Sequence, residues 1–401
     1  MVRGIFFSLV LLLLAVGCGG QAGQQGPILL WHSWTGSAAQ ALTRAVDQFE
    51  AITPGVRVIM TAVPAEQAQA DFRAAAALGL GPDVVLAPNS WVGPLAEAGL
   101  LRPLPSDSAS NGAFLGAAIR PLSHDGQLYG LPLALQVEAL YYNRQLTDER
   151  PQTLAEMLTQ GEAGSTVAVP TNFAASYWGI AAHGPPLFDD QGMMQPTSSG
   201  LEAWLAWLTM AQARPGLVLD RDQAALQTLF AQGEVATFIG RPEALGRFTQ
   251  TLGQATVDVG ALPEGPEGVA APILVSEGLL FNRASSDSQA AIALELARFL
   301  TNREQSAALL RDAGIVPANR NVRINARLYP VQAAFYSQAL TAAQLPDDLD
   351  LERFQQAGET MLGNVLAGVQ DPRPAVCAFG RQMAEGGQAV NLEACPESDD
   401  E

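Results

Sequence analysis

The chain has 401 residues, of which 48% are hydrophobic and 15% are charged, and its formal net charge is −18. This length and composition indicate a globular protein with room for two domains rather than a disordered chain. All 22 basic residues are arginine, which excludes Schiff-base and P-loop lysine chemistry. The acidic balance disfavours nucleic acid as a partner.

Residues 1–17 predict a secretory signal peptide. Arg3 precedes the uncharged run GIFFSLVLLLLAVG, whose apolar part is shorter than the about 20 residues that a membrane-spanning helix needs. The letters AVGC resemble a bacterial lipobox, although Ala15 stands where leucine is usual. That resemblance implies a lipid on Cys18, a flexible tether over residues 18–26, and an extracytoplasmic protein held at a membrane. An ordinary cleaved signal peptide is the alternative.

From residue 28 the pattern alternates between strand and helix. Strands are expected in ILLWHSW, VRVIMTA and GPDVVLA, with a helix after each of the first two. The first helix is expected to carry its apolar residues at helical spacing, at Leu42, Ala45, Val46, Phe49 and Ile52. This order predicts a parallel sheet covered by helices, whose ligands bind at the carboxyl ends of the strands. The segments HSWTG and PNSW lie at such ends.

The second half of the chain continues with mixed elements. Residues 126–146 predict a turn, an extended passage and a strand, and STVAVP predicts a buried strand. A helix over residues 201–214 places Leu201, Trp204, Leu205 and Leu208 on one stripe, so Trp204 and Trp207 are expected in the core. Cys377 and Cys395 predict a disulfide in an exported protein, with two free thiols as the alternative.

Five segments together resemble one protein family. They are LLWHSWTG, PDVV with LAEAGLLRPL, GQLYGLP with VEALYYN, ATFIGRPEAL, and FLTNREQSAALLRDAGIVPA. In this order they resemble the extracellular solute-binding proteins that serve ABC importers, of the sugar-binding type, over nearly all of the mature chain. This chain departs from the usual sequence of the family at two places, both where side chains usually line the cleft that binds the solute. Arg241 and Pro242 follow Gly240 where a tryptophan is usual, and Ser276-Glu277 replaces a glycine pair.

The resemblance implies a two-lobed α/β periplasmic-binding-protein fold, in which each lobe is a mostly parallel sheet flanked by helices and crossing strands form a hinge. Lobe one is expected at residues 27–136 and 283–322, and lobe two at residues 137–282 and 323–398. It implies a monomer that takes a sugar or oligosaccharide to the transmembrane subunits of a permease, without enzymatic turnover, cofactor or metal.

A sugar needs a flat aromatic platform and planar polar groups at its hydroxyl rim. The residues that could supply them at the predicted strand ends are Trp34, Thr35, Asn89, Trp91, Glu138, Trp178, Arg241 and Glu277. Core packing is the alternative for each tryptophan, and Trp31 is assigned to the core. An ion pair between Arg241 and Glu138 that holds the cleft without touching solute is the alternative for the arginine.

Other functions remain as alternatives. Adjacent strand residues point to opposite faces, so His32 and Ser33 cannot form a catalytic pair, whereas Glu138 and Glu277 leave a glycosidase open. The three histidines lack metal-ligand spacing, and Tyr141 with its neighbouring tyrosine is the only hint of an iron site. The remaining alternatives are a binding protein for a polyamine, a binding protein for a phosphorylated polyol held through Arg241, and a purely structural lipoprotein.

Overall fold

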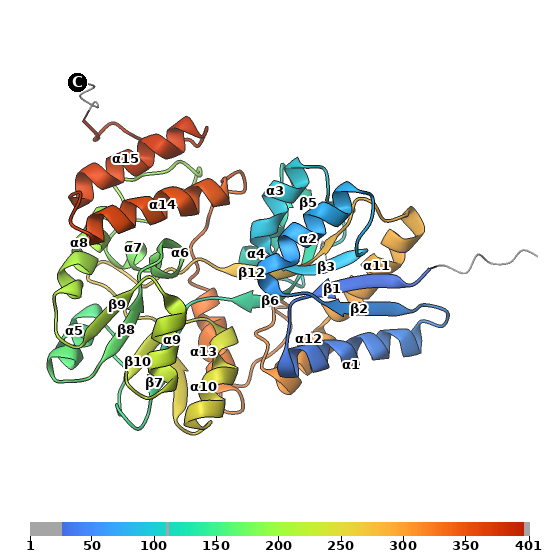
Figure 1. The fold of residues 1–401 in the computed structure, drawn as a ribbon, viewed down its shortest axis with the longest axis horizontal. Helices are drawn as coiled ribbons and strands as arrows, with labels where there is room; N and C mark the ends of the chain where they lie inside the picture. Colours follow the sequence, from blue (N-terminus) through green and yellow to red (C-terminus); the bar gives the residue numbers. More distant parts are fainter. Residues whose placement is uncertain (1–25, 110–111, 397–401) are drawn as a thin grey trace, which may run out of the picture.

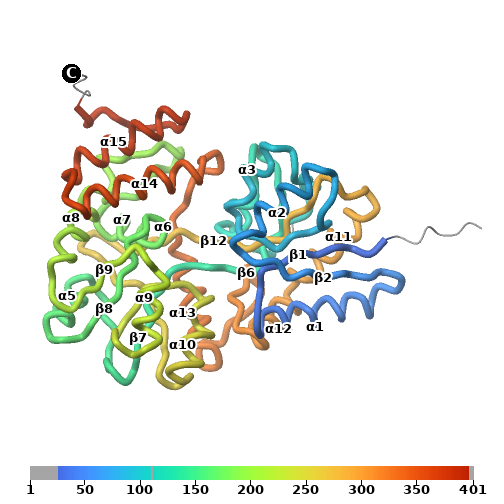
Figure 2. Tube along the Cα trace, in the orientation of Figure 1, coloured from blue at the N-terminus to red at the C-terminus, as the bar shows by residue number. Residues whose placement is uncertain are grey.

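The computed structural model describes residues 26–109 and 112–396. The predicted signal peptide, Cys18 and most of the tether lie outside these residues. Two α/β lobes lie side by side, each built on its own five-stranded sheet (Figures 1 and 2). The first lobe combines the start of the chain with a later segment, and the second holds the middle of the chain and its end. The predicted two-lobed fold is confirmed.

The sheet of lobe one has its strands in a nonsequential order. That order is β2 (Val58–Ala62), β1 (Ile28–His32), β3 (Val84–Pro88), β12 (Val275–Phe281) and β6 (Gly130–Gln136). β1 pairs in parallel with both β2 and β3, and only β12 runs against its neighbours. The predicted strand–helix–strand order therefore produces the expected parallel sheet. The carboxyl ends of β1 and β3 point toward lobe two (Figure 1).

The sheet of lobe two is also mostly parallel. Its order is β11 (Val257–Gly260), β7 (Ala139–Asn143), β10 (Thr237–Gly240), β8 (Val167–Pro170) and β9 (Leu217–Asp220). β7 alone is antiparallel to the strands beside it. All four residues of β8 are buried, as expected for a strand with helices over both faces. A two-stranded hairpin of β4 (Ser123–His124) and β5 (Gln127–Leu128) completes the strands.

Helices cover the faces of both sheets (Figure 1). Lobe one carries α1 (Gly36–Ile52), α2 (Ala65–Ala77), α3 (Val92–Glu97), α4 (Gly116–Ile119), α11 (Asp287–Leu300) and α12 (Arg303–Ala313). Lobe two carries α5 (Leu154–Glu162), α6 (Phe173–Ser176), α7 (Gly179–Ala182), α8 (Leu201–Gln212), α9 (Gln223–Ala231), α10 (Leu245–Leu252), α13 (Pro330–Ala339), α14 (Leu351–Leu366) and α15 (Pro372–Glu385). Three single turns of 3₁₀ helix are η1 (Asn89–Trp91), η2 (Arg120–Leu122) and η3 (Pro242–Ala244).

Local sequence explains where several helices begin. Ser286 and Asn302 precede α11 and α12, and each side chain accepts a hydrogen bond from the backbone N–H three residues on. Such caps satisfy donors that a helix start leaves unpaired. The stripe predicted in α8 is buried, and Trp204 and Trp207 stack with ring centroids 5.0 Å apart. Trp204 is core as expected, and Trp207 is half-buried.

The chain passes between the lobes at two places that involve the sheets. β6 in lobe one continues through Val137 and Glu138 directly into β7 in lobe two. The return passage follows β11 and leads into β12, which pairs with β3 and β6. Residues 275–281 therefore belong to the sheet of lobe one. The prediction that residues 137–282 all belong to lobe two is wrong for this strand. The apolar pattern of β12 shows a strand but not which sheet it joins.

Two further expectations concern single features. Ile52, expected on the apolar stripe of α1, is exposed because it is the last residue of the helix, whereas the other four stripe residues are buried.

Cys377 and Cys395 form a disulfide between α15 and the segment that follows it. Within residues 26–109 and 112–396, no helix is long and apolar enough to cross a membrane.

Candidate functional site

Polar side chains from both lobes meet where the chain passes from one sheet to the other. Trp34 follows β1, and its indole Nε1 donates to Glu277 Oε2 on β12 at 3.2 Å. Gln136, the last residue of β6, donates to the same oxygen through Nε2, also at 3.2 Å. These three residues form the lobe-one half of a group that we call the junction cluster. β12 lies between β3 and β6, so the pairing of the strands brings them together.

The lobe-two half of the junction cluster is a buried ion pair. Arg241 follows β10, and its Nε donates to Glu138 Oε1 at 2.6 Å. Glu138 is fully buried between β6 and β7, and the Arg241 side chain is 23% exposed. Tyr141 donates its hydroxyl to the Arg241 backbone carbonyl at 2.7 Å, which fixes the chain at this point. The arginine is therefore held through its Nε, and its side chain keeps partial exposure to solvent.

The junction cluster keeps unused hydrogen-bonding capacity. Within the described residues, Arg241 donates no hydrogen bond from Nη1 or Nη2, and Glu277 accepts none at Oε1. Among residues 26–109 and 112–396, Gln136 Oε1 and Glu138 Oε2 have no hydrogen-bond partner, and both atoms are buried. A planar guanidinium edge and a carboxylate oxygen are suited to a polar molecule that can both donate and accept.

Burial shapes the electrostatics of the junction cluster. Burial raises the pKa of Glu277, while the hydrogen bonds from Gln136 and Trp34 act in the opposite direction. Burial also raises the pKa of Glu138, against the charge of Arg241 and its hydrogen bond. Each carboxylate therefore lies in a place that disfavours its charge, and the hydrogen bonds that it accepts offset part of this effect. Such groups gather at functional sites more often than elsewhere in proteins.

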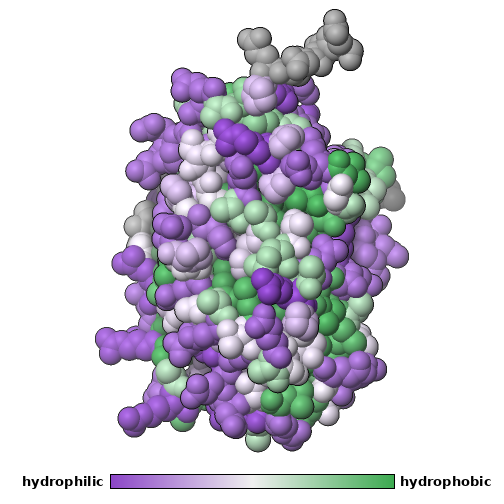
Figure 3. All heavy atoms as spheres, turned by 90° about the vertical axis from the view of Figure 1, so that its left-hand side faces the viewer, coloured by the Kyte–Doolittle hydropathy of each residue, from purple (hydrophilic) through white to green (hydrophobic). Residues whose placement is uncertain are grey.

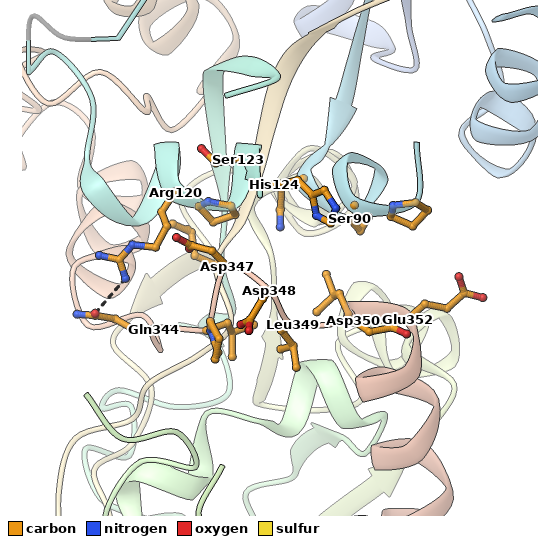
Figure 4. Close-up of a pocket in the computed structure, with 18 of the residues that line it drawn as sticks. Ser90, Arg120, Ser123, His124, Gln344, Asp347, Asp348, Leu349, Asp350 and Glu352 are labelled. Atoms are coloured by element: carbon orange, nitrogen blue, oxygen red, sulfur yellow. Dashed lines mark hydrogen bonds between the residues drawn. The ribbon is translucent and has the colours of Figure 1, made fainter. Parts of the chain in front are cut away.

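Two cavities adjoin this region. The first, of about 270 Å³, lies between the lobe-one surface around α3 and β4 and the segment that leads into α14 (Figure 4). From lobe one come Ser90, Glu97, Arg120, Ser123 and His124, together with Asn89. Opposite them lie Gln344, Asp347, Asp348, Leu349, Asp350 and Glu352. The cavity is therefore enclosed by both lobes and lined by more acidic than basic side chains.

The second cavity is larger, about 610 Å³, and lies mainly on lobe two. Tyr177, Ile180 and Phe188 contribute its apolar and aromatic lining. Arg120 and residues 343–348 line both cavities, and Arg120 Nη1 donates to Gln344 Oε1 at 3.1 Å across the lobes. The segment between α13 and α14 thus separates two neighbouring spaces.

The hairpin of β4 and β5 positions part of the first cavity. Asp125 and Gly126 connect the strands with positive φ angles of 49° and 70°, the conformation that two-residue hairpins favour and that Asp-Gly adopts readily. This tight turn places Ser123 and His124 at the cavity wall. The nearest acidic atom to His124 Nε2 is 3.7 Å away.

The structure brings five of the expected ligand-binding residues to this region with accessible atoms. Trp34 and Arg241 lie in the junction cluster, as does half-buried Glu277. Thr35 is exposed at the start of α1. Asn89 lines the first cavity, and its Oδ1 accepts from the Ser276 backbone N–H at 2.9 Å. That bond joins the cavity wall to the strand that carries Glu277.

Three expected ligand-binding residues lie in protein interiors instead. Trp178 is fully buried, and its ring packs on Trp204 with centroids 4.8 Å apart. Trp91 is buried against Phe72. Glu138 is covered by Arg241, so the ion pair weighed as the alternative is present. The sequence does not show whether a tryptophan at a strand end is a ligand platform or a core residue. Only the packing of the folded chain distinguishes these two roles.

Other cavity residues were not anticipated. Arg120, Ser90 and the segment 344–352 carry no spacing signal that marks a site, because they come from a 3₁₀ turn and an irregular connection. The adjacent Asp347 and Asp348 were the only visible hint in the sequence. Within residues 26–109 and 112–396, no group of three or more His, Cys, Asp or Glu could hold a metal ion. His32 is buried, and burial lowers its pKa.

Several known proteins are similar to this chain. A maltotriose-binding protein of Pyrococcus abyssi is 24% identical over 60% of this chain, and the match spans 54% of that relative's length. A galactooligosaccharide-binding protein of Bacillus subtilis is also 24% identical, over 80% of each chain. A solved cyclo/maltodextrin-binding protein in complex with maltotetraose superimposes with a TM-score of 0.76 at 23% identity, covering 93% of this chain and all of the other. At that identity the structural likeness shows the fold.

Residues 44–330 match the family model described as bacterial extracellular solute-binding protein. This stretch includes most of both lobes, the junction cluster except Trp34, and the lobe-one wall of the first cavity. The family consists of binding proteins, so the expectation of a binding protein rather than an enzyme is confirmed. The chain belongs to the bacterial extracellular solute-binding protein family.

Proposed function

We propose that this protein captures a saccharide between its two lobes and delivers it to an ABC importer. One observation carries the proposal. The outer edge of the Arg241 guanidinium and the free Oε1 of Glu277 lie in one cluster with the half-buried indole of Trp34. A pyranose presents an apolar face and a rim of hydroxyls, and this combination of groups matches both.

The chemistry of each group supports a division of roles. The Nη1 and Nη2 atoms of Arg241 form a planar fork that donates to neighbouring hydroxyl oxygens, while Glu277 Oε1 accepts from a hydroxyl. Trp34 offers a flat apolar surface, and its bond to Glu277 fixes the ring. Glu138 positions Arg241 from behind and does not reach the solute.

The proposed binding groups come from different lobes, so the solute would be captured by closure of the two lobes. Glu277 and Trp34 belong to lobe one, whereas Arg241 belongs to lobe two. A solute that contacts both sets stabilises the arrangement in which they are close, so binding shifts the population toward a closed form. Residues 137–138 and the return passage before β12 would form the hinge.

The named relatives support the saccharide class, because their printed names refer to maltotriose and galactooligosaccharide. The glycans differ between relatives, whereas an apolar sugar face and a hydroxyl rim are common to both. The proposal is therefore made for the class and not for one sugar.

A second candidate is a polycationic solute such as a polyamine, and one specific observation favours it. The first cavity is lined by Glu97, Asp347, Asp348, Asp350 and Glu352, against Arg120 as the only arginine. Burial raises the pKa of Asp347, with Asp348 acting in the same direction and Arg120 against it. An ammonium group would compensate this excess of negative charge.

We further propose that Cys18 carries a lipid and that the protein works outside the cytoplasm with the transmembrane subunits of a permease. The lipobox-like AVGC and the short apolar run before it support this location. One relative is named as a maltooligosaccharide solute-binding lipoprotein. An intact mass that includes diacylglycerol on residue 18, lost in Cys18→Ser, is the expected result.

A screen of the chain from residue 18 separates the candidates. Thermal shift is measured with maltotriose, maltotetraose, galactooligosaccharides, spermidine and a polyol phosphate, and each hit is titrated by calorimetry. We expect stabilisation by an oligosaccharide, with binding lost in Arg241→Met and retained in Arg214→Met, a half-exposed arginine on lobe two. Stabilisation by spermidine alone would replace the saccharide with the cationic solute.

A further inference from the structure

The edge of lobe one where β1, β2 and β3 begin exposes large apolar side chains. Ile52 ends α1 and is 66% exposed. Leu78 and Leu80 follow α2 and are 76% and 64% exposed. Gly79 and Gly81, with φ of 72° and 97°, turn the chain sharply here, so both leucines project from a tight connection. Large exposed apolar groups that share an edge indicate a contact surface.

Backbone pairing shows that these side chains share one edge. The Ile28 N–H donates to the Arg57 carbonyl at 2.8 Å, and the Asp83 N–H donates to the Leu29 carbonyl at 2.8 Å. The turns that enter β2 and β3 therefore flank the first residues of β1. Figure 1 shows the start of β1 and the end of α1 together at the end of lobe one that lies farthest from lobe two.

Two arginines lie at the same edge. Arg57 precedes β2, and its side chain is 82% exposed. Arg283 follows β12 and is exposed. The preceding Asn282 donates from Nδ2 to the Leu80 carbonyl at 2.9 Å, which places Arg283 beside the leucine turn. We call Ile52, Arg57, Leu78, Leu80 and Arg283 the amino-edge patch.

The composition of the amino-edge patch suits the surface of an anionic bilayer. Leucine and isoleucine enter the boundary of the acyl chains, and arginine pairs with phosphate headgroups. The protein as a whole carries a net charge of −18, so most of its surface is repelled by such a bilayer. Figure 3 shows the opposite end, on lobe two, where hydrophilic side chains project from most of the outline.

The length of the tether brings the amino-edge patch within reach of a membrane. Gly26 lies two residues before β1 and eight residues after Cys18. Eight residues span at most about 28 Å when extended, and about 16 Å on average as a glycine-rich coil. A lipid on Cys18 would therefore hold this edge of lobe one close to the bilayer.

We propose that the amino-edge patch rests on the lipid surface, with the lipid on Cys18 as its anchor. This inference rests on the proposed lipidation. The diacylglycerol on Cys18 would supply the attachment itself, and the amino-edge patch would add a second, weak contact that orients lobe one on the bilayer. The short tether gives that contact a high effective concentration. Lobe one then lies on the bilayer by the edge opposite to the cleft, and lobe two stays free to close.

The test replaces the natural lipid so that it does not depend on lipidation. The chain from residue 18, with Cys18→Ser and an amino-terminal hexahistidine, is bound to vesicles of phosphatidylcholine, phosphatidylglycerol and a nickel-chelating lipid. An environment-sensitive fluorophore is attached at Leu80→Cys, with the Cys377–Cys395 disulfide left intact. Val369→Cys is the matched control, because Val369 follows α14 on lobe two and is 74% exposed.

The label at position 80 is expected to shift to the blue on the vesicles and to be quenched by brominated acyl chains, while the label at 369 changes in neither respect. Arg57→Glu together with Arg283→Glu should reduce the shift. An unchanged label at 80, or an equal shift at 369, would overturn the proposal. So would a blue shift without vesicles at raised protein concentration, which would indicate a second copy of the chain. The mass of residue 18 in the native chain tests the lipid separately.

Discussion

Glu138 Oε1 lies 2.6 Å from Nε of Arg241, and this contact joins the passage between the two sheets to the end of β10. Removing the carboxylate leaves a largely enclosed guanidinium without its partner. Glu138→Ala should lower the free energy of unfolding by about 3 kcal/mol. Denaturant unfolding followed by circular dichroism measures the change.

The matched control for this change is Glu162→Ala. Glu162 pairs with Arg214 at 3.3 Å, but both side chains are about half exposed, so its loss should cost less than about 1 kcal/mol. Equal effects of the two substitutions would show that the buried pair is not the main contribution at Glu138.

Trp34 offers a direct test of the proposed platform. Trp34→Ala should weaken solute binding more than tenfold, which corresponds to about 1.4 kcal/mol, because the flat surface and the bond to Glu277 are both lost. Trp34→Phe keeps an aromatic face without the N–H donor, and should retain part of the affinity. Calorimetric titration gives both values. The control is Trp207→Ala on α8, which should leave affinity unchanged, and a normal affinity in Trp34→Ala would remove this residue from the site.

Trp178 is expected to behave differently from Trp34. Its ring is fully buried against Trp204, so Trp178→Ala should cost about 3–5 kcal/mol of stability. At a temperature where the variant is folded, its affinity should be close to that of the unchanged protein. Thermal unfolding and titration of the same sample distinguish the roles. A selective loss of affinity with normal stability would return Trp178 to the ligand-binding residues.

The shifted pKa of Glu277 predicts how stability depends on pH. The pKa of Glu277 is raised in the folded state, chiefly by burial, relative to its ordinary value of 4.5. The folded protein then binds more protons than the unfolded chain, so its contribution to stability is present at low pH and declines as pH rises through the folded pKa. Glu277→Gln should flatten this decline, which begins near the ordinary pKa of 4.5 and ends above the raised pKa of the folded state, measured as urea midpoints. Glu162→Gln serves as the exposed control, and an unaltered profile in Glu277→Gln would contradict the assignment.

The disulfide should contribute to the stability of the C-terminal segment. Cys377 and Cys395 are 18 residues apart, and closing such a loop restricts the unfolded chain by about 3 kcal/mol in the loop-entropy estimate. The paired substitutions Cys377→Ser and Cys395→Ser should lower the free energy of unfolding by a similar amount. Reductant should lower the urea midpoint of the unchanged protein and leave that of the double variant where it is. A reductant effect on the double variant would exclude the disulfide as the cause.

The order of strands and helices could be predicted from the sequence because it depends on local periodicity. The apolar stripe of α1 and the buried run of β8 are both patterns within a few residues. The family resemblance likewise extends along the chain in sequence order. These features gave the two-lobed fold and the strand ends where Trp34 and Arg241 lie.

Only the tertiary structure decided which strand-end residues face solvent. Trp34 and Trp178 look alike in sequence, yet one bonds to Glu277 and the other packs on Trp204. The partner of each ring comes from a distant segment of the chain, so local sequence patterns cannot predict the contact. The cavity wall at residues 344–352 was missed for the same reason, because an irregular connection has no period. Burial, and with it the difference between a ligand platform and a core residue, is a property of packed elements and not of any one of them.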